Sequence, residues 1–159
     1  MKFNSALRNF VLVLFSTLLI SACSTAKKAK VDTTDDVYTG TDTIEFLAKG
    51  VPDRVFFATN KSKLTTRSRD TLRKQATFLR KNKDVTVTVE GHADERGTRE
   101  YNLALGERRA NAAKDYLMTY GVSGKRITVI SYGKEKPVNP ASSPLAWSQN
   151  RRSVTIKTN

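Results

Sequence analysis

Hydrophobic and polar positions recur with helical spacing in two segments of the chain. Residues 66–82 predict a helix, because Leu72, Ala76 and Leu79 follow one another at i, i+4 and i+7. Residues 99–120 predict a second, longer helix that ends before Gly121, a residue typical of helix C-termini. The apolar stripe of this second helix consists of Leu103, Ala110, Ala113, Leu117 and Tyr120.

Four shorter segments have the pattern of strands. Residues 85–90 (VTVTVE) alternate with a period of two, which predicts a half-buried strand. Three further strands are predicted over residues 54–58, 127–132 and 153–157. Residues 133–146 contain one glycine and three prolines and predict a loop. The resulting order favours an α+β domain over residues 51–159, with two helices on one face of a four-stranded mixed sheet.

The N-terminal residues 1–22 have the pattern of a secretory signal peptide. Lys2 and Arg8 precede an apolar stretch over residues 10–20, which is too short to span a bilayer comfortably. The stretch ends in the sequence ISAC, an aliphatic residue and two small residues before Cys23, as in a lipobox. We therefore predict a covalent lipid on Cys23. A plain secretory signal with an incidental cysteine is the alternative. Ser24, in place of aspartate, favours the outer membrane over the inner membrane.

Residues 23–50 are predicted to form a periplasmic tether between the lipid and the domain. Residues 24–42 contain few aliphatic side chains, and such a composition buries too little apolar surface to offset the entropy of ordering. Residues 43–50 (TIEFLAKG) are more apolar and could dock on the domain.

The positive charge lies almost entirely on the predicted domain. The chain has 28 basic and 15 acidic residues, a net charge of +13. Residues 55–159 hold 21 of the basic and 9 of the acidic residues, which gives 21 − 9 = +12. Such a charge in a cytosolic protein would suggest nucleic acid. An exported lipoprotein meets instead phospholipid headgroups, lipopolysaccharide and peptidoglycan carboxylates, so no nucleic-acid partner is expected.

One cysteine and one histidine limit the cofactors that the chain could hold. They exclude an internal disulfide framework, a cysteine-rich zinc site and any site that needs two imidazoles. We expect no metal and no cofactor other than the covalent lipid on Cys23. His92 is expected to be a hydrogen-bonded loop residue, and Trp147 a packing residue beneath the proline-rich loop.

Polar residues concentrate where the second strand gives way to the second helix. Residues 91–98 (GHADERGT), 101–102 (YN) and 105–112 (LGERRANA) resemble the OmpA-like peptidoglycan-binding domain, in the form found in lipoproteins of the Tol–Pal system. Residues 131–137 (SYGKEKP) and 150–152 (NRR) match this form as well, so the resemblance covers about residues 54–157.

The resemblance implies a binding site for diaminopimelate, the third residue of the Gram-negative stem peptide. Asp94 and Arg109 stand at the fifteen-residue spacing of the family's characteristic pair. A carboxylate and a guanidinium that face one pocket complement the ammonium and the carboxylate of this ligand. Because both would lie in a polar site, replacing either with alanine should leave the fold intact.

Four further residues are assigned to the pocket by the resemblance. The family lines it with the residues that correspond to Asn102 and Leu105, and Arg152 corresponds to an arginine that supports the acidic residue. Asn60 stands where an aspartate is usual, so the acceptor oxygen is retained but the charge is lost.

Three alternative functions make different demands on the sequence. A glycan-cleaving enzyme would need two carboxyl groups that face each other across a long cleft. The candidates are Glu90, Asp94, Glu95 and Glu100. Nearby arginines would lower the pKa of such a carboxyl group, whereas a general acid needs a raised pKa. A motor-stator protein would need an uncleaved spanning helix. A protein-interaction module remains open, because the resemblance implies a second partner, the periplasmic β-propeller protein TolB. We therefore expect a non-enzymatic outer-membrane lipoprotein that faces the periplasm, binds peptidoglycan and serves envelope integrity and cell division.

Overall fold

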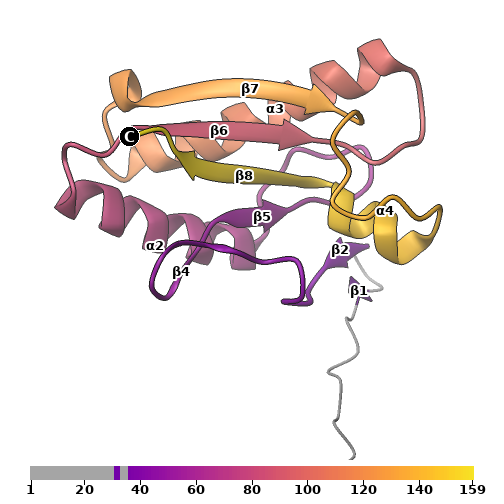
Figure 1. Cartoon of the computed structure of the whole chain (residues 1–159), viewed down its shortest axis with the longest axis horizontal. Helices are drawn as coiled ribbons and strands as arrows, with labels where there is room; N and C mark the ends of the chain where they lie inside the picture. Colours follow the sequence, from indigo (N-terminus) through magenta and orange to yellow (C-terminus); the bar gives the residue numbers. More distant parts are fainter. Residues whose placement is uncertain (1–30, 33–35) are drawn as a thin grey trace, which may run out of the picture.

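A mixed four-stranded sheet forms the centre of the protein (Figure 1). The structure is a computed structural model that describes residues 31–32 and 36–159; the predicted signal peptide and Cys23 lie outside the described residues. The sheet order is β5–β8–β6–β7, with β6 and β7 parallel and the other pairs antiparallel. The strands are β5 (Arg54–Phe56), β6 (Val87–His92), β7 (Ile127–Gly133) and β8 (Arg152–Lys157).

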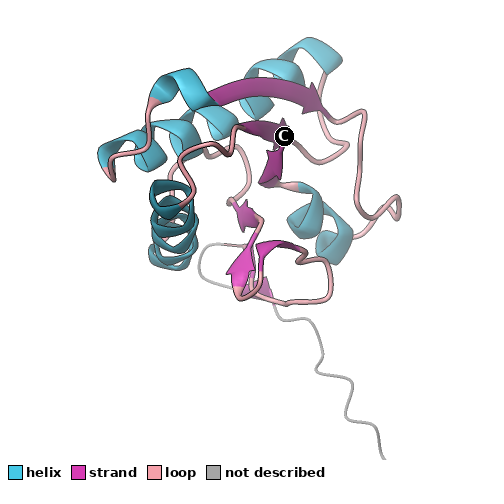
Figure 2. Cartoon of the chain, turned by 60° about the vertical axis from the view of Figure 1, so that its left-hand side comes forward, coloured by secondary structure: helices cyan, strands magenta, loops and turns pink. Residues whose placement is uncertain are grey.

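Two long helices cover one face of this sheet, as the sequence predicted (Figure 2). They are α2 (Thr66–Lys81) and α3 (Arg99–Thr119). Each begins at a threonine whose hydroxyl accepts a backbone N–H of the first turn, from Ser68 to Thr65 and from Tyr101 to Thr98. A short 3-10 turn, η1 (Gly124–Arg126), leads into β7. The predicted α+β class is confirmed.

The apolar core lies between the helices and the sheet. The predicted face of α2 is buried, with Leu72 and Leu79 almost fully enclosed. The apolar stripe predicted for α3 is buried only at Ala110, Ala113 and Leu117. Its two end residues are partly exposed, Leu103 by 49% and Tyr120 by 37%. The first turns of α3 lie over polar loops instead of the core, so the residues buried there are Asn102, Leu105, Gly106 and Arg109.

Helix α3 lies unusually close to strand β6 at a pair of glycines. A Cβ atom on Gly91 would come within 1.8 Å of the Gly106 carbonyl oxygen. A Cβ atom on Gly106 would come within 2.4 Å of the Ser131 hydroxyl. No side chain fits at either position, so these glycines set the distance between the end of β6 and the start of α3.

The segment predicted as a loop over residues 133–146 ends in a third helix, α4 (Pro144–Asn150). The prediction was wrong at Pro144, because proline is well tolerated in the first turn of a helix, where its missing N–H would have no intrahelical partner. Ser143 caps this helix by accepting the Ala146 N–H. Helix α4 leads directly into β8 and lies beside the end of β6 (Figure 1).

The described part of the predicted tether contributes three short strands, and a fourth follows at the predicted start of the domain. β1 (Val31–Asp32) pairs with β2 (Val37–Tyr38), and β3 (Phe46–Ala48) pairs with β4 (Val51–Pro52). Tyr38 is 1% exposed, and its ring lies 4.8 Å from that of Phe56. Residues before the predicted domain start at residue 51 therefore also pack on the sheet. The buried side chains of Val37, Tyr38 and Leu47 attach residues 36–50 to the domain, and Leu47 belongs to the 43–50 stretch that the sequence predicted could dock.

No helix within residues 31–32 and 36–159 is long and apolar enough to cross a membrane.

Candidate ligand-binding site

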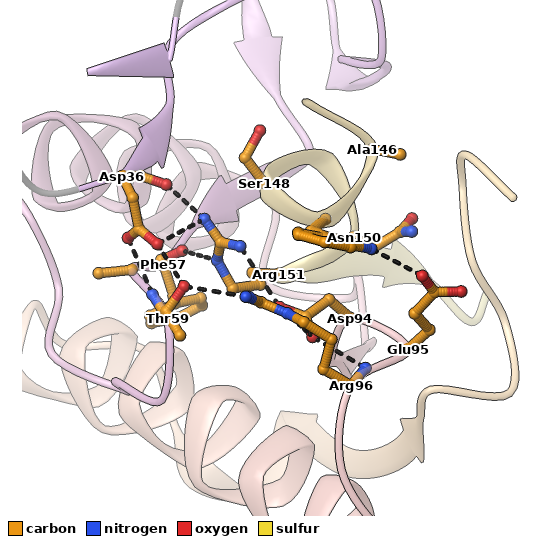
Figure 3. Close-up of polar contacts among 12 residues, drawn as sticks. Asp36, Phe57, Thr59, Asp94, Glu95, Arg96, Ala146, Ser148, Asn150 and Arg151 are labelled. Carbon is orange, nitrogen blue, oxygen red and sulfur yellow. Dashed lines mark hydrogen bonds and ion pairs between the residues drawn. The ribbon is translucent and has the colours of Figure 1, made fainter. Parts of the chain in front are cut away.

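The carboxylate of Asp94 lies just beyond the end of β6 and is 7% exposed. Its Oδ1 accepts hydrogen bonds from the backbone N–H and the Nε of Arg96, each at 3.1 Å. Its Oδ2 accepts the Nη2 of Arg96 at 2.7 Å and the Nη1 of Arg151 at 3.3 Å. The carboxylate is therefore held between two guanidinium groups that come from opposite sides (Figure 3).

The charge of Asp94 is favoured by these bonds. Burial alone would raise its pKa, but the hydrogen bonds from the side chain and backbone of Arg96, and that from Arg151, outweigh burial and lower it. Hydrogen bonds from Trp147 and Ser142 likewise lower the pKa of Glu95. A general acid needs a raised pKa, so neither carboxyl is tuned to be the proton donor that glycoside cleavage requires.

A closed ring of polar contacts joins Asp94 to the N-terminal segment (Figure 3). Arg151 Nη2 contacts the carboxylate of Asp36 at 3.2 Å and also donates to its backbone carbonyl. Thr59 donates its N–H, at 2.9 Å, and its hydroxyl to the same carboxylate. Arg96 Nη2 donates to the Thr59 hydroxyl at 3.2 Å and completes the circuit. We call Asp36, Thr59, Asp94, Arg96 and Arg151 the polar ring.

Arg109 is fully buried and holds the backbone of the site. Its Nε donates to the carbonyl of Lys61 at 2.9 Å, its Nη1 to that of His92 at 2.8 Å, and its Nη2 to that of Ala58 at 3.1 Å. The guanidinium also lies 5.4 Å from the ring of Phe57. Burial, reinforced by the charge of Arg151, lowers the pKa of Arg109 to about 10. Arg109 therefore joins the loop after β5 to the end of β6 and presents no exposed surface to a ligand.

Arg96 is the accessible one of the two arginines that hold Asp94, because 42% of its side chain is exposed, compared with 3% for Arg151. Its guanidinium stacks on Trp147, 4.4 Å from the ring centroid. The indole N–H of Trp147 donates to Glu95 at 2.8 Å, so α4 holds both Glu95 and Arg96. The sequence predicted Trp147 as a packing residue and did not predict its hydrogen bond to Glu95. Of the groups around Asp94, Arg96 is the one that an incoming cation could displace.

Three other predicted pocket residues lie around this loop with different roles. Asn102 is buried, and its side chain donates to the Arg96 carbonyl at 2.9 Å, which fixes the loop from α3. Leu105 is buried in α3. Asn60 is exposed and has a φ of 55°, a left-handed conformation that asparagine tolerates better than most residues.

The predicted support of Asp94 by Arg152 is wrong. Arg151 holds Asp94, whereas Arg152 donates to the carbonyl groups of Asn150 and Lys136. Arg152 lines a groove of about 570 Å³ on the sheet, together with Glu90 and Val154. Arg151 is the C-cap residue of α4 and Arg152 is the first residue of β8, so the two side chains leave the chain in different directions and reach different partners. The pair of consecutive arginines in residues 150–152 was visible in the sequence, but the end of α4 that separates their directions was not.

A family model matches the chain from residue 56 to residue 151, the span that contains β6, β7, all three described α-helices and every member of the polar ring except Asp36. The model describes the OmpA family. The chain belongs to the OmpA family.

Relatives of this OmpA family chain include two peptidoglycan-associated lipoproteins. That of Rhizobium meliloti (strain 1021) is 55% identical over 106 residues, which are 67% of this chain and 60% of that protein. That of Brucella melitensis biotype 1 is 41% identical over 150 residues, which are 91% of this chain and 89% of that protein. The chain thus spans just under two thirds of the first of these relatives and most of the second.

Solved structures agree with this family assignment. The crystal structure of the peptidoglycan-associated lipoprotein from Burkholderia pseudomallei is 34% identical, with a TM-score of 0.65, and covers 67% of this chain and 90% of that chain. The C-terminal domain of Helicobacter pylori MotB, at 22% identity and a TM-score of 0.63, covers 67% of this chain and 84% of that chain and shares the fold.

The single histidine of this OmpA family domain lies at the end of β6, and in the described residues it joins no metal cluster. His92 is 1% exposed, its ring stacks on Tyr132 at 5.6 Å, and its Nε2 lies 3.4 Å from Glu90 Oε2. Burial, helped by the charges of Arg152 and Lys136, lowers the pKa of His92 to about 3. The imidazole is therefore neutral at pH 7.

The free energy of unfolding should decrease as the pH falls from 6.5 towards 5. The unfolded chain binds a proton on His92 near pH 6.5, whereas the folded chain does so only near pH 3. Stability from this group is present above pH 6.5 and is lost between these values, at about 1 kcal/mol per pH unit. Urea denaturation of the protein and of His92→Gln at pH 7, 6 and 5 measures this, and the variant should have a flatter slope. Equal slopes would contradict the prediction.

Proposed function

We propose that this protein is an outer-membrane lipoprotein that binds peptidoglycan non-covalently through Asp94 and so connects the membrane to the cell wall. The relatives named peptidoglycan-associated lipoprotein support this function. The single observation that carries the site is a buried, ionised carboxylate whose most exposed partner is the Arg96 side chain. A covalent lipid on Cys23 would provide the membrane attachment.

The ligand chemistry that suits this arrangement is a zwitterion. The ammonium group of a diaminopimelate side chain would replace the Arg96 guanidinium on Asp94. Arg96, once released, would remain next to the ligand and pair with its carboxylate. One internal ion pair is thus exchanged for two pairs with the ligand, and neither charge is left unpaired in the site.

Arg109 has a different role in this proposal from the one inferred from the sequence. Its donors are committed to the carbonyl groups of Ala58, Lys61 and His92, so it shapes the pocket and adds positive potential beneath it. The residue proposed to bind the ligand carboxylate directly is therefore Arg96 and not Arg109. Asn102 assists by holding the Arg96 backbone.

The proposed setting is the Tol–Pal system, with roles in envelope integrity and cell division and with TolB as a second partner. The relatives' names and the OmpA family fold support the peptidoglycan role directly, and the Tol partnership follows from the resemblance of residues 91–112 to lipoproteins of that system. We propose no catalytic step.

Soluble stem peptides test the ligand assignment. We expect a free diaminopimelate stem to bind at least about tenfold more tightly than a lysine stem, which lacks the second carboxylate and leaves Arg96 unpaired. Amidation of that carboxylate should weaken binding to a similar degree, and cross-linking should abolish it by consuming the amine. Isothermal titration calorimetry with the free diaminopimelate, lysine, amidated and cross-linked stems measures the four affinities. Equal affinity for the diaminopimelate and lysine stems would overturn the zwitterion assignment.

The lipid anchor is tested at the protein's N-terminus. Cys23→Ser should yield an unlipidated form that no longer fractionates as a mature outer-membrane protein, because no other cysteine is present in the chain. Mass spectrometry of the mature N-terminus and membrane fractionation measure the outcome. A mature, acylated Cys23→Ser protein in the outer membrane would contradict the lipobox prediction.

A further inference from the structure

We propose that Asp36 is a positioning residue for the ligand site, so that docking of the N-terminal segment on the domain and ligand binding at Asp94 strengthen each other. The inference rests on the proposed function and adds a regulatory contact to the same site. It comes from the polar ring, in which the segment that leads towards the predicted anchor reaches both arginines that hold Asp94.

Asp36 fixes the first of these arginines directly. The guanidinium of Arg151 is 3% exposed and is held on one side by the Phe57 carbonyl, which accepts its Nε at 3.1 Å, and on another side by Asp36. The remaining nitrogen, Nη1, points to Asp94. Because Asp36 shares the charge of Arg151, the carboxylate of Asp94 is only partly neutralised and retains attraction for a cationic ligand.

Asp36 acts on the second arginine through Thr59. Its carboxylate accepts both the N–H and the hydroxyl of Thr59. The proton of the Thr59 hydroxyl therefore points to Asp36. The oxygen of the same hydroxyl is then free to accept a hydrogen bond from Arg96 Nη2. Docking of Asp36 therefore orients the acceptor that helps to place Arg96.

The charge balance of the polar ring gives the direction of the effect. With Asp36 docked, two carboxylates face two guanidiniums, and exchange of Arg96 for a ligand ammonium preserves that balance. Without Asp36 the cluster has one positive charge in excess, which disfavours a cation at Asp94. By thermodynamic linkage, a ligand that binds better when Asp36 is docked must also stabilise the docked segment by the same factor.

Asp36→Asn isolates this charge. Asparagine has nearly the same size, tolerates the φ of 49° at this position and still accepts the Thr59 N–H. Asp42→Asn is the matched control, because Asp42 belongs to the same segment but bonds Gln149, at 3.0 Å, instead of Arg151. Asp94→Asn reports whether the ligand site itself is correctly assigned.

The experiment is calorimetric titration of the full chain in detergent with a soluble, uncross-linked diaminopimelate muropeptide, at 20 mM and 500 mM salt. At low salt we expect Asp36→Asn to bind about fivefold or more weakly than the wild type, and Asp42→Asn to bind within twofold of it. The difference should shrink at high salt, because the contact is partly exposed.

Hydrogen exchange distinguishes a positioning role of Asp36 from a purely structural one, because only a positioning role makes the protection of the segment depend on the ligand. In the wild type, the muropeptide should slow exchange of the Thr59 amide, which donates to Asp36, and of the amides of β2. In Asp36→Asn this protection should be lost, although the variant should melt like the wild type.

The possible outcomes separate this inference from the proposed function. If Asp94→Asn binds the muropeptide like the wild type, the ligand site is misplaced and both fail. If Asp94→Asn loses binding while Asp36→Asn retains it, the ligand site stands and the inference is overturned. Equal losses in Asp36→Asn and Asp42→Asn would also overturn it, because ordinary contacts of the segment, and not the bridge through Arg151, would then be responsible.

Discussion

Asp94→Asn should reduce binding of the protein to isolated peptidoglycan sacculi by about tenfold or more. The substitution keeps the size of the side chain and an acceptor for the Arg96 N–H, but it removes the negative charge that Arg96 and Arg151 share. Charge-assisted hydrogen bonds contribute about 1.5–3 kcal/mol each, so loss of the ligand's ammonium contact alone accounts for a factor of this size. Co-sedimentation with sacculi over a range of protein concentrations measures it.

Asp70→Asn is the control for this experiment. Asp70 lies on the exposed surface of α2 and pairs with Arg73, so the same chemical change occurs away from the polar ring. It should leave sedimentation unchanged. If Asp94→Asn sediments like Asp70→Asn, general attraction between a basic domain and an acidic polymer would explain binding, and this attraction should decrease steeply with salt.

Of the substitutions proposed for this protein, Arg109→Ala should destabilise the fold most. We expect it to lower the free energy of unfolding by about 3 kcal/mol or more. The substitution removes a fully buried side chain and leaves the carbonyl groups of Ala58, Lys61 and His92 without their donor. The expectation from the sequence that the fold would tolerate this change is therefore withdrawn. Loss of sacculus binding in this variant would report unfolding of the site.

Urea denaturation of Arg109→Ala and Arg109→Lys measures this effect. Lysine keeps the charge and can satisfy some of the carbonyl groups, so it should be intermediate in stability. A midpoint for Arg109→Ala equal to that of the wild type would contradict the role of Arg109 as the group that joins the two loops.

The central sheet and its helices were predictable because their patterns are local. The alternation in residues 85–90 and the spacing of Leu72, Ala76 and Leu79 report burial directly, although β6 runs over Val87–His92 and so begins and ends two residues later than predicted. Helix α4 was missed because a proline-rich composition masks a first turn that accepts proline.

The candidate site was only partly predictable, since its contacts join distant parts of the chain. The spacing of Asp94 and Arg109 identified two residues that lie close to the same loops, but it could not show that Arg109 is committed to backbone carbonyl groups. The choice between Arg151 and Arg152 depends on where α4 ends, because that point separates the directions of the two side chains. Asp36 meets Arg151 across 115 positions of sequence, from a segment whose composition predicts no order.

The point at which the chain enters the domain determines which contacts would carry mechanical load. β2, next to Asp36, lies at the end of the sheet where β6 and α4 meet the polar ring, away from the C-terminus (Figure 1). With the membrane attached on the N-terminal side and the wall held at Asp94, tension would run from Asp36 through Arg151 to the ligand and bypass the hydrogen bonds between β5, β8, β6 and β7. Strain in the envelope would then load the contacts of the ligand site directly, and the site and the anchor would share one end of the domain.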